Sequence, residues 1–299
     1  PSSYPCVRQV ANMQRELGHT GLSVNAIGLG AMPLSISGRP SEVQAFAVIE
    51  AFVAAGGNFI DTANVYCLDD DDIGHNERLI HQALQRIGAT EQVIVATKGG
   101  LRRPGGAWVV DGTPDGLRLS CERSLQALQT DRITLYQLHA VDSKVDLRRS
   151  LEALIRLQEE GKIAHLGLSN VSTAQIEQAL ALTPITSVQN RCNLFDKRDC
   201  RSGLIEFCQA RQITYIPYSP VGGHHGHLRL GREPLLGQLA AKYQVSPYRV
   251  ALAWLLSQGG HVLPIPGASK VSSTQDSLRA VELALDADEI AAFEQLPDL

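Results

Sequence analysis

Short apolar runs alternate with stretches of helical periodicity along most of this chain. Between the runs, apolar residues recur every three or four positions, which is the spacing of a helix with one buried face. This alternation predicts an α/β fold of the (β/α)8 TIM-barrel type, in which parallel strands close on themselves inside a ring of helices. The predicted strands cover residues 24–29, 58–61, 92–98, 133–139, 163–168, 186–189, 213–218 and 261–265.

Local signals mark the ends of several predicted helices. Ser41 is an expected N-cap, and Thr113 followed by Pro114 opens another apolar helix face. Both patterns suit a first helical turn. Gly161 follows the apolar face at residues 151–157 and is an expected C-cap.

Further segments extend the repeat at both ends. Residues 13–28 contain Gly18-His-Thr-Gly21 between short alternating runs, which predicts an N-terminal β-hairpin. Residues 235–242 and 286–296 predict two extra helices near the C-terminus. Since no linker interrupts the pattern, we expect residues 1–299 to form a single domain.

An open doubly wound sheet is the competing fold. Its dinucleotide-binding form would carry G-x-G-x-x-G after the first strand. Gly28 and Gly30 are present, but Pro33 occupies the position of the third glycine. The barrel is therefore the preferred prediction.

Composition narrows the class of protein. The chain has 299 residues, 44% hydrophobic and 19% charged, with a formal net charge of −4. This balance argues against a general nucleic-acid or anionic-membrane partner, although it leaves room for a local phosphate pocket. No apolar run is long enough to span a bilayer, and residues 1–15 lack the order of a signal peptide. Six cysteines without a CxxC pair indicate reduced thiols and a cytoplasmic location. The sequence leaves the oligomeric state open, with a monomer as the favoured state.

Four chemically active side chains lie near the ends of successive predicted strands. They are Asp61, Tyr66, Lys98 and His139. Catalytic residues of such barrels sit at the carboxyl ends of several strands, so these four should converge. A phenol is a poor acid at neutral pH, and a nearby ammonium is expected to lower its pKa. The group therefore predicts an enzyme that reduces a carbonyl, with Tyr66 as proton donor. His139 would either orient the substrate oxygen or share in the proton transfer.

Taken singly, each of these residues has an ordinary structural explanation. Asp61 could cap a turn, Tyr66 could pack at the barrel rim, Lys98 could be a solvated loop residue and His139 a core histidine. Their convergence at strand ends is what makes the catalytic interpretation the better one.

The chain resembles the aldo-keto reductase family in seven segments that follow the family's order. They are Phe59-Ile-Asp-Thr-Ala-Asn-Val-Tyr66, Ala96-Thr-Lys98, Leu138-His139, Gly167-Leu-Ser-Asn170, Gln189-Asn190, Tyr218-Ser-Pro220 and Pro264-Ile-Pro-Gly-Ala-Ser-Lys270. The resemblance implies NADPH bound at the carboxyl-terminal face, Tyr66 as acid, Lys98 and Asp61 tuning it, and His139 polarising the carbonyl.

The resemblance also implies the cofactor contacts. Ser169, Asn170 and Gln189 would hold the nicotinamide carboxamide, although alone they suit a helix cap and a strand end. Tyr218 would stack on the nicotinamide, where packing in the barrel is the ordinary alternative. The remaining expected contacts are Gly30, Met32, Ser219, Val221, Gly222, Gly267, Ser269, Lys270, Ser273, Asp276 and Ser277.

The adenosine end departs from the family pattern. Lys270 could pair with a 2′-phosphate, and Asp276 matches the family's acid near adenine. Ser273 and Ser277 replace the Arg or Gln and the Asn of many members. The grip on adenine and the degree of preference for NADPH are therefore open.

Two polar clusters contain residue types that can bind metal ions, but we predict that neither is a metal site. The run Asp69–Asp72 lacks EF-hand spacing and is expected to be a solvated rim loop. His224, His225 and His227 lie in the Gly-rich connection 220–234, which is expected to be a mobile loop over the cofactor.

The substrate is less clearly specified. Met32 and Trp108 are the expected apolar walls, the latter in the long connection 102–112. The last predicted helix lies close to the end of the sequence, so we expect an open pocket that accepts aldehydes better than ketones. A non-catalytic nicotinamide-binding subunit of the same family, and a barrel isomerase or aldolase that uses Lys98 as a Schiff-base amine, are the alternatives.

Overall fold

The computed structural model describes residues 14–297, except for the side chains of His224 and His225. Met13, the first residue of the predicted hairpin, lies outside this range. The strands are β1 (Gln14–Glu16), β2 (Ser23–Asn25), β3 (Leu29–Gly30), β4 (Phe59–Asp61), β5 (Ile94–Gly99), β6 (Leu101–Arg102), β7 (Val109–Val110), β8 (Ile133–Leu138), β9 (Ile163–Ser169), β10 (Ser187–Arg191) and β11 (Thr214–Tyr218).

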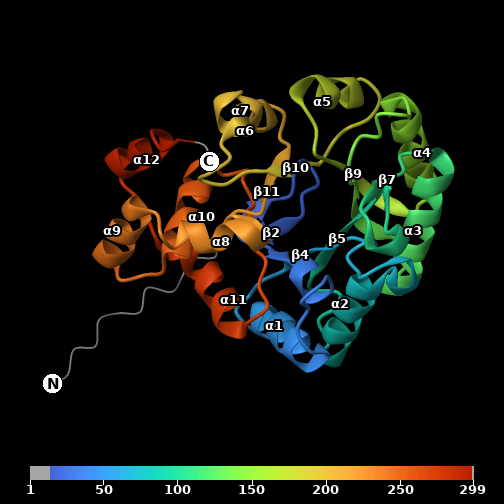
Figure 1. Cartoon of the computed structure of the whole chain (residues 1–299). Coiled ribbons are helices and arrows are strands. Elements are labelled where there is room, and N and C mark those ends of the chain that lie inside the picture. Colours follow the sequence, from blue (N-terminus) through green and yellow to red (C-terminus); the bar gives the residue numbers. More distant parts are fainter. Residues whose placement is uncertain (1–13, 298–299) are drawn as a thin grey trace.

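Helices surround the sheet (Figure 1). The α-helices are α1 (Glu42–Ala54), α2 (His75–Arg86), α3 (Pro114–Leu128), α4 (Leu147–Glu159), α5 (Thr173–Leu180), α6 (Arg198–Arg201), α7 (Leu204–Gln209), α8 (Gly223–Leu230), α9 (Pro234–Tyr243), α10 (Pro247–Ser257), α11 (Val271–Leu278) and α12 (Ala287–Glu294). The 3-10 helices are η1 (Met32–Leu34), η2 (Asp70–Asp72), η3 (Pro104–Gly106) and η4 (Arg279–Glu282). The two predicted extra helices correspond to α9 and α12.

Seven parallel strands form a nearly closed barrel, in the order β11-β10-β9-β8-β5-β4-β3. The predicted eighth strand is a segment that runs through the gap between β11 and β3. Leu263 N donates to Tyr215 O (2.8 Å) on one side, and Gly30 N donates to Pro266 O (3.1 Å) on the other. Because Pro264 and Pro266 have no N–H to donate, the segment forms isolated bridges instead of a continuous ladder.

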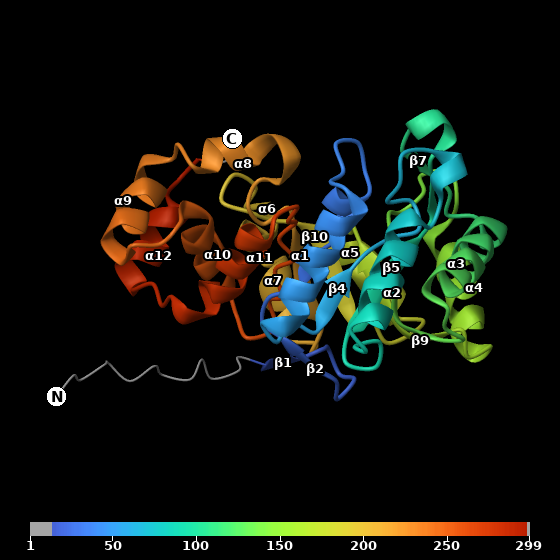
Figure 2. The same ribbon diagram turned by 90° about the horizontal axis from the view of Figure 1, so that it is seen from below.

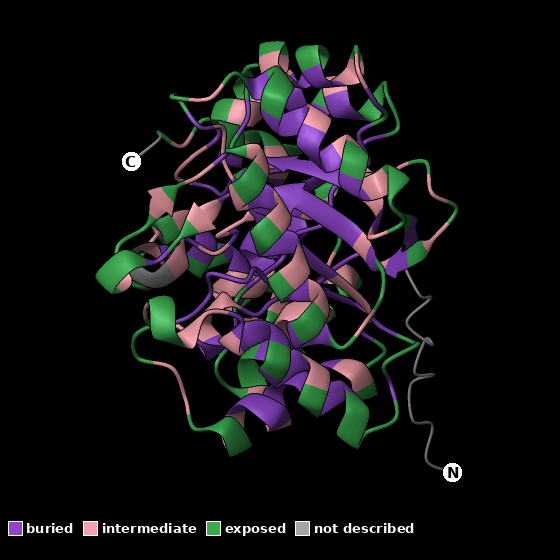
Figure 3. Ribbon diagram, turned by 90° about the vertical axis from the view of Figure 1, so that its right-hand side faces the viewer, coloured by how far each residue is buried: buried purple, intermediate pink, exposed green. Residues whose placement is uncertain are grey.

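The hairpin covers the amino-terminal end of the barrel (Figure 2). β1 pairs antiparallel with β2, and Leu17 and Val24 are fully buried. They belong to the same apolar cluster as Phe59, Leu135 and Ile216 from inside the barrel. Larger apolar clusters fill the layer between the strands and the helices, and the buried residues follow the sheet in Figure 3.

The local signals at helix ends are confirmed. Ser41 Oγ accepts a hydrogen bond from Gln44 N (3.3 Å), and Thr113 Oγ1 accepts one from Gly116 N (3.1 Å). Gly161, just beyond α4, has φ = +77°, a conformation that suits glycine.

The predicted first strand, residues 24–29, is wrong as a single element. Its first part belongs to β2 of the hairpin, and its last residue starts β3 of the barrel. The chain turns between them, so one apolar run serves two sheets.

Candidate active site

A cavity of about 870 Å³ lies at the carboxyl ends of the barrel strands, on the face away from the hairpin. It brings together most residues that the sequence singled out. Those that line it are Gly30, Met32, Asp61, Tyr66, Trp108, His139, Ser169, Asn170, Gln189, Tyr218, Ser219, Val221, Gly267, Ser269, Lys270, Ser273, Asp276 and Ser277. Lys98 is fully buried behind this surface, and the neighbouring Gly223 lines the cavity where Gly222 was expected.

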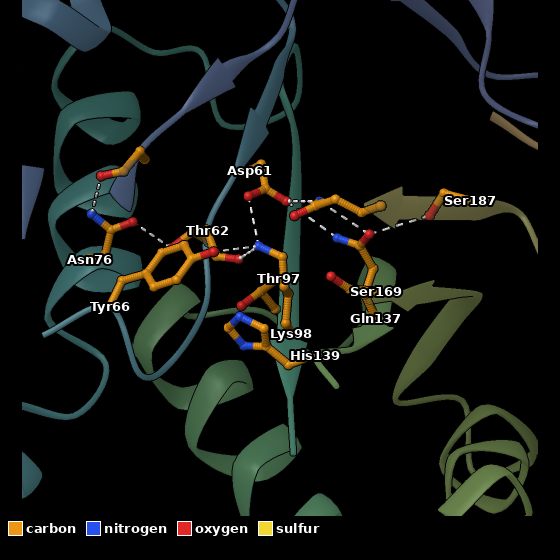
Figure 4. A network of polar contacts seen from close by, with 12 residues as sticks. Asp61, Thr62, Tyr66, Asn76, Thr97, Lys98, Gln137, His139, Ser169 and Ser187 are labelled. Atoms are coloured by element: carbon orange, nitrogen blue, oxygen red, sulfur yellow. Dashed lines mark hydrogen bonds and ion pairs between the residues drawn. The ribbon is translucent and has the colours of Figure 1, made fainter. Parts of the chain in front are cut away.

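Lys98 is the centre of the predicted tetrad. Its Nζ donates hydrogen bonds to Asp61 Oδ2 (2.6 Å), Thr62 O (2.8 Å) and Tyr66 Oη (2.9 Å). Figure 4 shows these groups converging on the ammonium. The three donors of a lysine are thereby all used, which fixes the ammonium between the acid and the phenol.

The ion pair keeps Lys98 charged. Burial alone would lower the pKa of its ammonium, but Asp61 and Tyr66 raise the pKa above its ordinary value. A lysine that attacks a carbonyl needs a depressed pKa. The Schiff-base alternative therefore does not fit this site.

The expected lowering of the Tyr66 pKa is not found. Burial raises the pKa of the Tyr66 phenol above its ordinary value, and the Lys98 ammonium opposes this rise without reversing it. Desolvation of a phenolate outweighs one nearby cation that Asp61 already neutralises. Tyr66 therefore remains a protonated hydroxyl at neutral pH, which is the form that a proton donor needs.

His139 stands beside the phenol, just after β8. Its ring centroid lies 5.7 Å from that of Tyr66, in an edge-to-face arrangement. Burial, assisted by the nearby Lys98 charge, holds the pKa of His139 well below its ordinary value. The imidazole is thus neutral, and its Nδ1 has no hydrogen-bond partner among residues 14–297.

The predicted carboxamide-binding residues lie together on the adjoining wall. Asn170 Nδ2 donates to His139 O (3.0 Å), and Asn170 Oδ1 accepts from Tyr218 Oη (2.8 Å). Gln189 Nε2 donates to Asp61 Oδ1 (2.8 Å). These amides are therefore oriented by the tetrad itself, while Ser169 is buried at the end of β9.

Comparison with known proteins is decisive for the family. The profile of the aldo/keto reductase family matches residues 26–298. A probable aldo-keto reductase 1 from Glycine max is 32% identical over an alignment of 312 positions, which covers 94% of this chain and 88% of the relative. The chain belongs to the aldo-keto reductase family.

Solved structures of aldo-keto reductases share the fold. The enzyme AKR11C1 from Bacillus halodurans, in its holo form, is 26% identical with a TM-score of 0.78, covering 94% of this chain and 95% of that one. An aldo/keto reductase from Klebsiella pneumoniae, solved with NADP and acetate, is 25% identical with a TM-score of 0.78 and covers 94% of both chains.

The far end of the cavity lies at the start of α11. Lys270 is exposed and stands in the N-cap position. Asp276, the acid matched to the aldo-keto reductase family, is held by Arg249 through Nη2 (2.5 Å) and Nε (3.0 Å) and by Ser246 Oγ. The sequence did not indicate this ion pair, because Arg249 comes from a different helix.

The connection 220–234 was expected to be a loop, and this expectation is wrong. It contains α8, whose eight residues begin at Gly223. Gly222 has φ = +87°, and a Cβ there would lie 2.6 Å from Gly226 C. Glycines lower helix propensity, so the pattern alone did not predict this helix. His227 lines the cavity, whereas the side chains of His224 and His225 lie outside the described residues.

The acidic run is structural in part. Asp69 caps η2 by accepting from Asp71 N (3.1 Å). Asp72 pairs with Arg39 (2.6 Å) and accepts from Leu68 N (3.2 Å), so it is not a solvated rim residue as expected. Within the described part of the chain, no three His, Cys, Asp or Glu side chains are grouped to hold a metal ion.

Sequence reasoning missed the residues behind the tetrad, at the start of α2. Asn76 Oδ1 accepts from Thr62 Oγ1 (2.6 Å), and Glu77 Oε1 accepts from Thr97 Oγ1 (2.6 Å). Both α2 side chains are fully buried. The sequence offered no signal for them, because only the fold shows that these two polar residues are buried and therefore need partners.

Two further observations concern membrane-spanning helices and the cysteines. None of the helices between residues 14 and 297 is long and apolar enough to cross a membrane. The five cysteines in the described range are free thiols, and Cys6 lies outside it.

Proposed function

We propose that this protein reduces aldehydes, and some ketones, to alcohols with NADPH as hydride source and Tyr66 as general acid. The observation that carries the proposal is the Lys98 ammonium, which donates to both Tyr66 Oη and Asp61 at the floor of the cavity. A phenol so placed can give its proton to a carbonyl oxygen and leave a phenolate that Lys98 stabilises.

His139 supports the same chemistry. A neutral imidazole has one N–H to donate. From its position beside Tyr66 on the cavity surface, that donor can point the substrate oxygen toward the phenol. Such orientation matters because catalysis depends on holding the reacting groups in line.

The cavity suits a nicotinamide cofactor. Asn170 and Gln189 present amides near the tetrad, and Tyr218 offers a flat ring beside them. Lys270 provides a cation at the far end, where a 2′-phosphate would bind. Gly30 allows close approach of the wall, since a Cβ there would lie 2.7 Å from Ile265 O. Bound NADPH supplies a hydride to the carbonyl carbon.

A non-catalytic binding subunit is the alternative, and nothing favours it. The relatives described above are aldo-keto reductases by name. Asp61, Tyr66, Lys98 and His139 are all present and in reach of one another. A binding module would have no need of this arrangement.

Exchange of Tyr66 for phenylalanine tests the acid assignment. Tyr66→Phe should slow the reduction of 4-nitrobenzaldehyde at least about 100-fold, because a positioned general acid contributes that much. NADPH oxidation would be followed by absorbance, and cofactor binding by fluorescence titration, which should give the wild-type affinity. Wild-type turnover by Tyr66→Phe would show that another group donates the proton.

A further inference from the structure

Trp108 is the most exposed of the aromatic side chains that are described as lining the cavity. It precedes β7 in a short hairpin formed by β6 and β7, and it is 49% exposed. Its ring nevertheless packs edge-to-face on Tyr66, with centroids 6.4 Å apart. An exposed indole on a loop needs something to hold it there, since rotamer freedom otherwise costs binding energy.

Arg103 lies under this indole. Its guanidinium carbon is 3.9 Å from the centroid of the Trp108 ring, and the residue is only 5% exposed. Nε and Nη1 are buried and have no hydrogen-bond partner in the described part of the chain. A guanidinium covered by an aromatic face in this way gains from cation–π attraction and stacking.

The other edge of the guanidinium is anchored to the turn that carries Tyr66. Nη2 donates to Cys67 O and to Leu68 O, both at 3.0 Å. Within this turn, Cys67 Sγ, which has a single hydrogen to donate, lies 3.3 Å from two possible acceptors, Val65 O and Asp69 O. Arg103 therefore links the loop of Trp108 to the backbone directly after the proposed acid.

The charges around the cavity restrict the class of substrate that can bind near Tyr66. Among the side chains known to line it, Lys270 is the one with a permanent positive charge, and it lies at the opposite end from Tyr66. Near Tyr66 the lining includes Met32 and Trp108. Two cations lie close to Tyr66, but both are buried: Lys98 donates to Asp61, Thr62 and Tyr66, and Arg103 is covered by the Trp108 ring. An anionic substrate would therefore find no exposed cation there, whereas a flat apolar ring would find an aromatic wall.

We propose that Arg103 is a positioning residue that holds Trp108 beside Tyr66, so that the substrate end of the cavity is a slot for uncharged aromatic aldehydes. This inference rests on the proposed reductase function. Arg103 does not touch the substrate in this account; it acts through the indole.

Kinetics with two aldehydes test the slot. Arg103→Met should raise KM for 4-nitrobenzaldehyde about fivefold, the equivalent of one modest cation–π contact. KM for butanal and for NADPH should change less than about twofold, because neither needs the indole. Arg123→Met is the matched control, since Arg123 is an exposed arginine of α3 that does not line the cavity, and its loss should leave all three constants unchanged. An equal rise for both aldehydes, or no rise, overturns the proposal.

Fluorescence tests the positioning without turnover. The chain has two tryptophans, and Trp254 is buried. Subtracting the emission of Trp108→Phe isolates Trp108, whose quenching by acrylamide should increase in Arg103→Met. Unchanged quenching in a folded Arg103→Met protein also overturns the proposal.

A double-mutant cycle separates positioning from general damage. In a Trp108→Ala background, Arg103→Met should have no further effect on the 4-nitrobenzaldehyde KM. If Arg103→Met does not fold, Trp108→Leu alone must still abolish the preference for the aromatic aldehyde; retention of the preference refutes the slot. Failure of the wild type to oxidise NADPH with either aldehyde would instead refute the proposed function.

Discussion

At the scale of single residues, we expect the loss of Lys98 to have the largest effects on stability and activity. It is a fully buried cation, and Asp61 is the buried anion that neutralises it. Removing one partner of such a pair leaves the other uncompensated. Stability and chemistry at this position are therefore coupled.

Lys98→Met should lower the free energy of unfolding by about 3–5 kcal/mol and abolish most activity. Urea denaturation and the aldehyde assay measure the two effects. Lys162→Met is the control, because Lys162 pairs with Glu122 and Glu160 on the surface. Loss of this surface lysine should lower the free energy of unfolding by less than about 1 kcal/mol. Similar losses in both variants would contradict the role of the buried pair.

Lys270 tests cofactor selection at the other end of the cavity. Lys270→Ala should raise KM for NADPH about tenfold, the worth of one charge-assisted contact, and leave KM for NADH nearly unchanged. The comparison variant is Lys162→Ala, whose lysine adjoins the amino end of β9, away from the cavity. Equal effects on the two cofactors would remove the proposed pairing with the 2′-phosphate.

At the scale of elements, the start of α2 supports three strand ends. Asn76 Nδ2 donates to Ala31 O (2.9 Å), and its Oδ1 accepts from Thr62. Glu77 accepts from Thr97, the residue before Lys98. The helix start therefore holds the backbone from which the tetrad projects.

Glu77 makes this support sensitive to pH. Burial raises the pKa of its carboxyl from 4.5 to about 7, and the Thr97 hydrogen bond only partly opposes this. Its stabilising contribution is therefore full below about pH 4.5 and is lost as the pH rises through about 7. Glu77→Gln should gain stability relative to the wild type between pH 5 and pH 8, as measured by urea denaturation at several pH values. Glu50→Gln, on the exposed side of α1, should run parallel to the wild type throughout.

The elements that were predicted correctly from the sequence were those with strong local signals. The runs that became β5 and β8 were placed within about two residues, and the caps at Ser41 and Thr113 were correct. Errors arose where tertiary contacts, rather than local sequence, determine the secondary structure. Examples are the division of residues 24–29 between two sheets and the Gly-rich α8.

The candidate site shows the same division. The tetrad was identifiable because its members lie near strand ends and match family segments. Arg103, Asn76 and Arg249 were not, because the fold determines their partners: Arg103 donates to Cys67 O and Leu68 O, Asn76 accepts from Thr62, and Arg249 pairs with Asp276. Nothing in the sequence marks the arginine five residues before Trp108 as the one that faces its indole.

At the scale of the whole molecule, the segment at residues 261–267 is the weakest part of the barrel wall. It is joined to its neighbours by isolated bridges rather than ladders. The proposed cofactor would contact Ser219 after β11 and Gly267 in this segment. A ligand that contacts both sides of this junction stabilises the form of the protein in which the barrel wall is intact there.

Addition of NADP+ should therefore slow hydrogen exchange at the amides of Gly28, Gly30 and Ile265, which donate across this junction. Exchange measured by mass spectrometry of peptides would detect it. Peptides of α4, on the opposite side, serve as the internal reference and should not change. Uniform protection of both regions would indicate global stabilisation instead.

The same junction bears on the order of folding. It pairs residues 28–30 with residues 264–267, which come from opposite ends of the described chain. Contacts between such distant segments form late, because the loop-closure entropy is paid before they contribute. Since Gly30, Gly267 and Lys270 all line the cavity, we expect the proposed cofactor-binding surface to be among the last parts of the molecule to be completed. A chain emerging from the ribosome would thus acquire its tetrad before it acquires the means to bind the hydride donor.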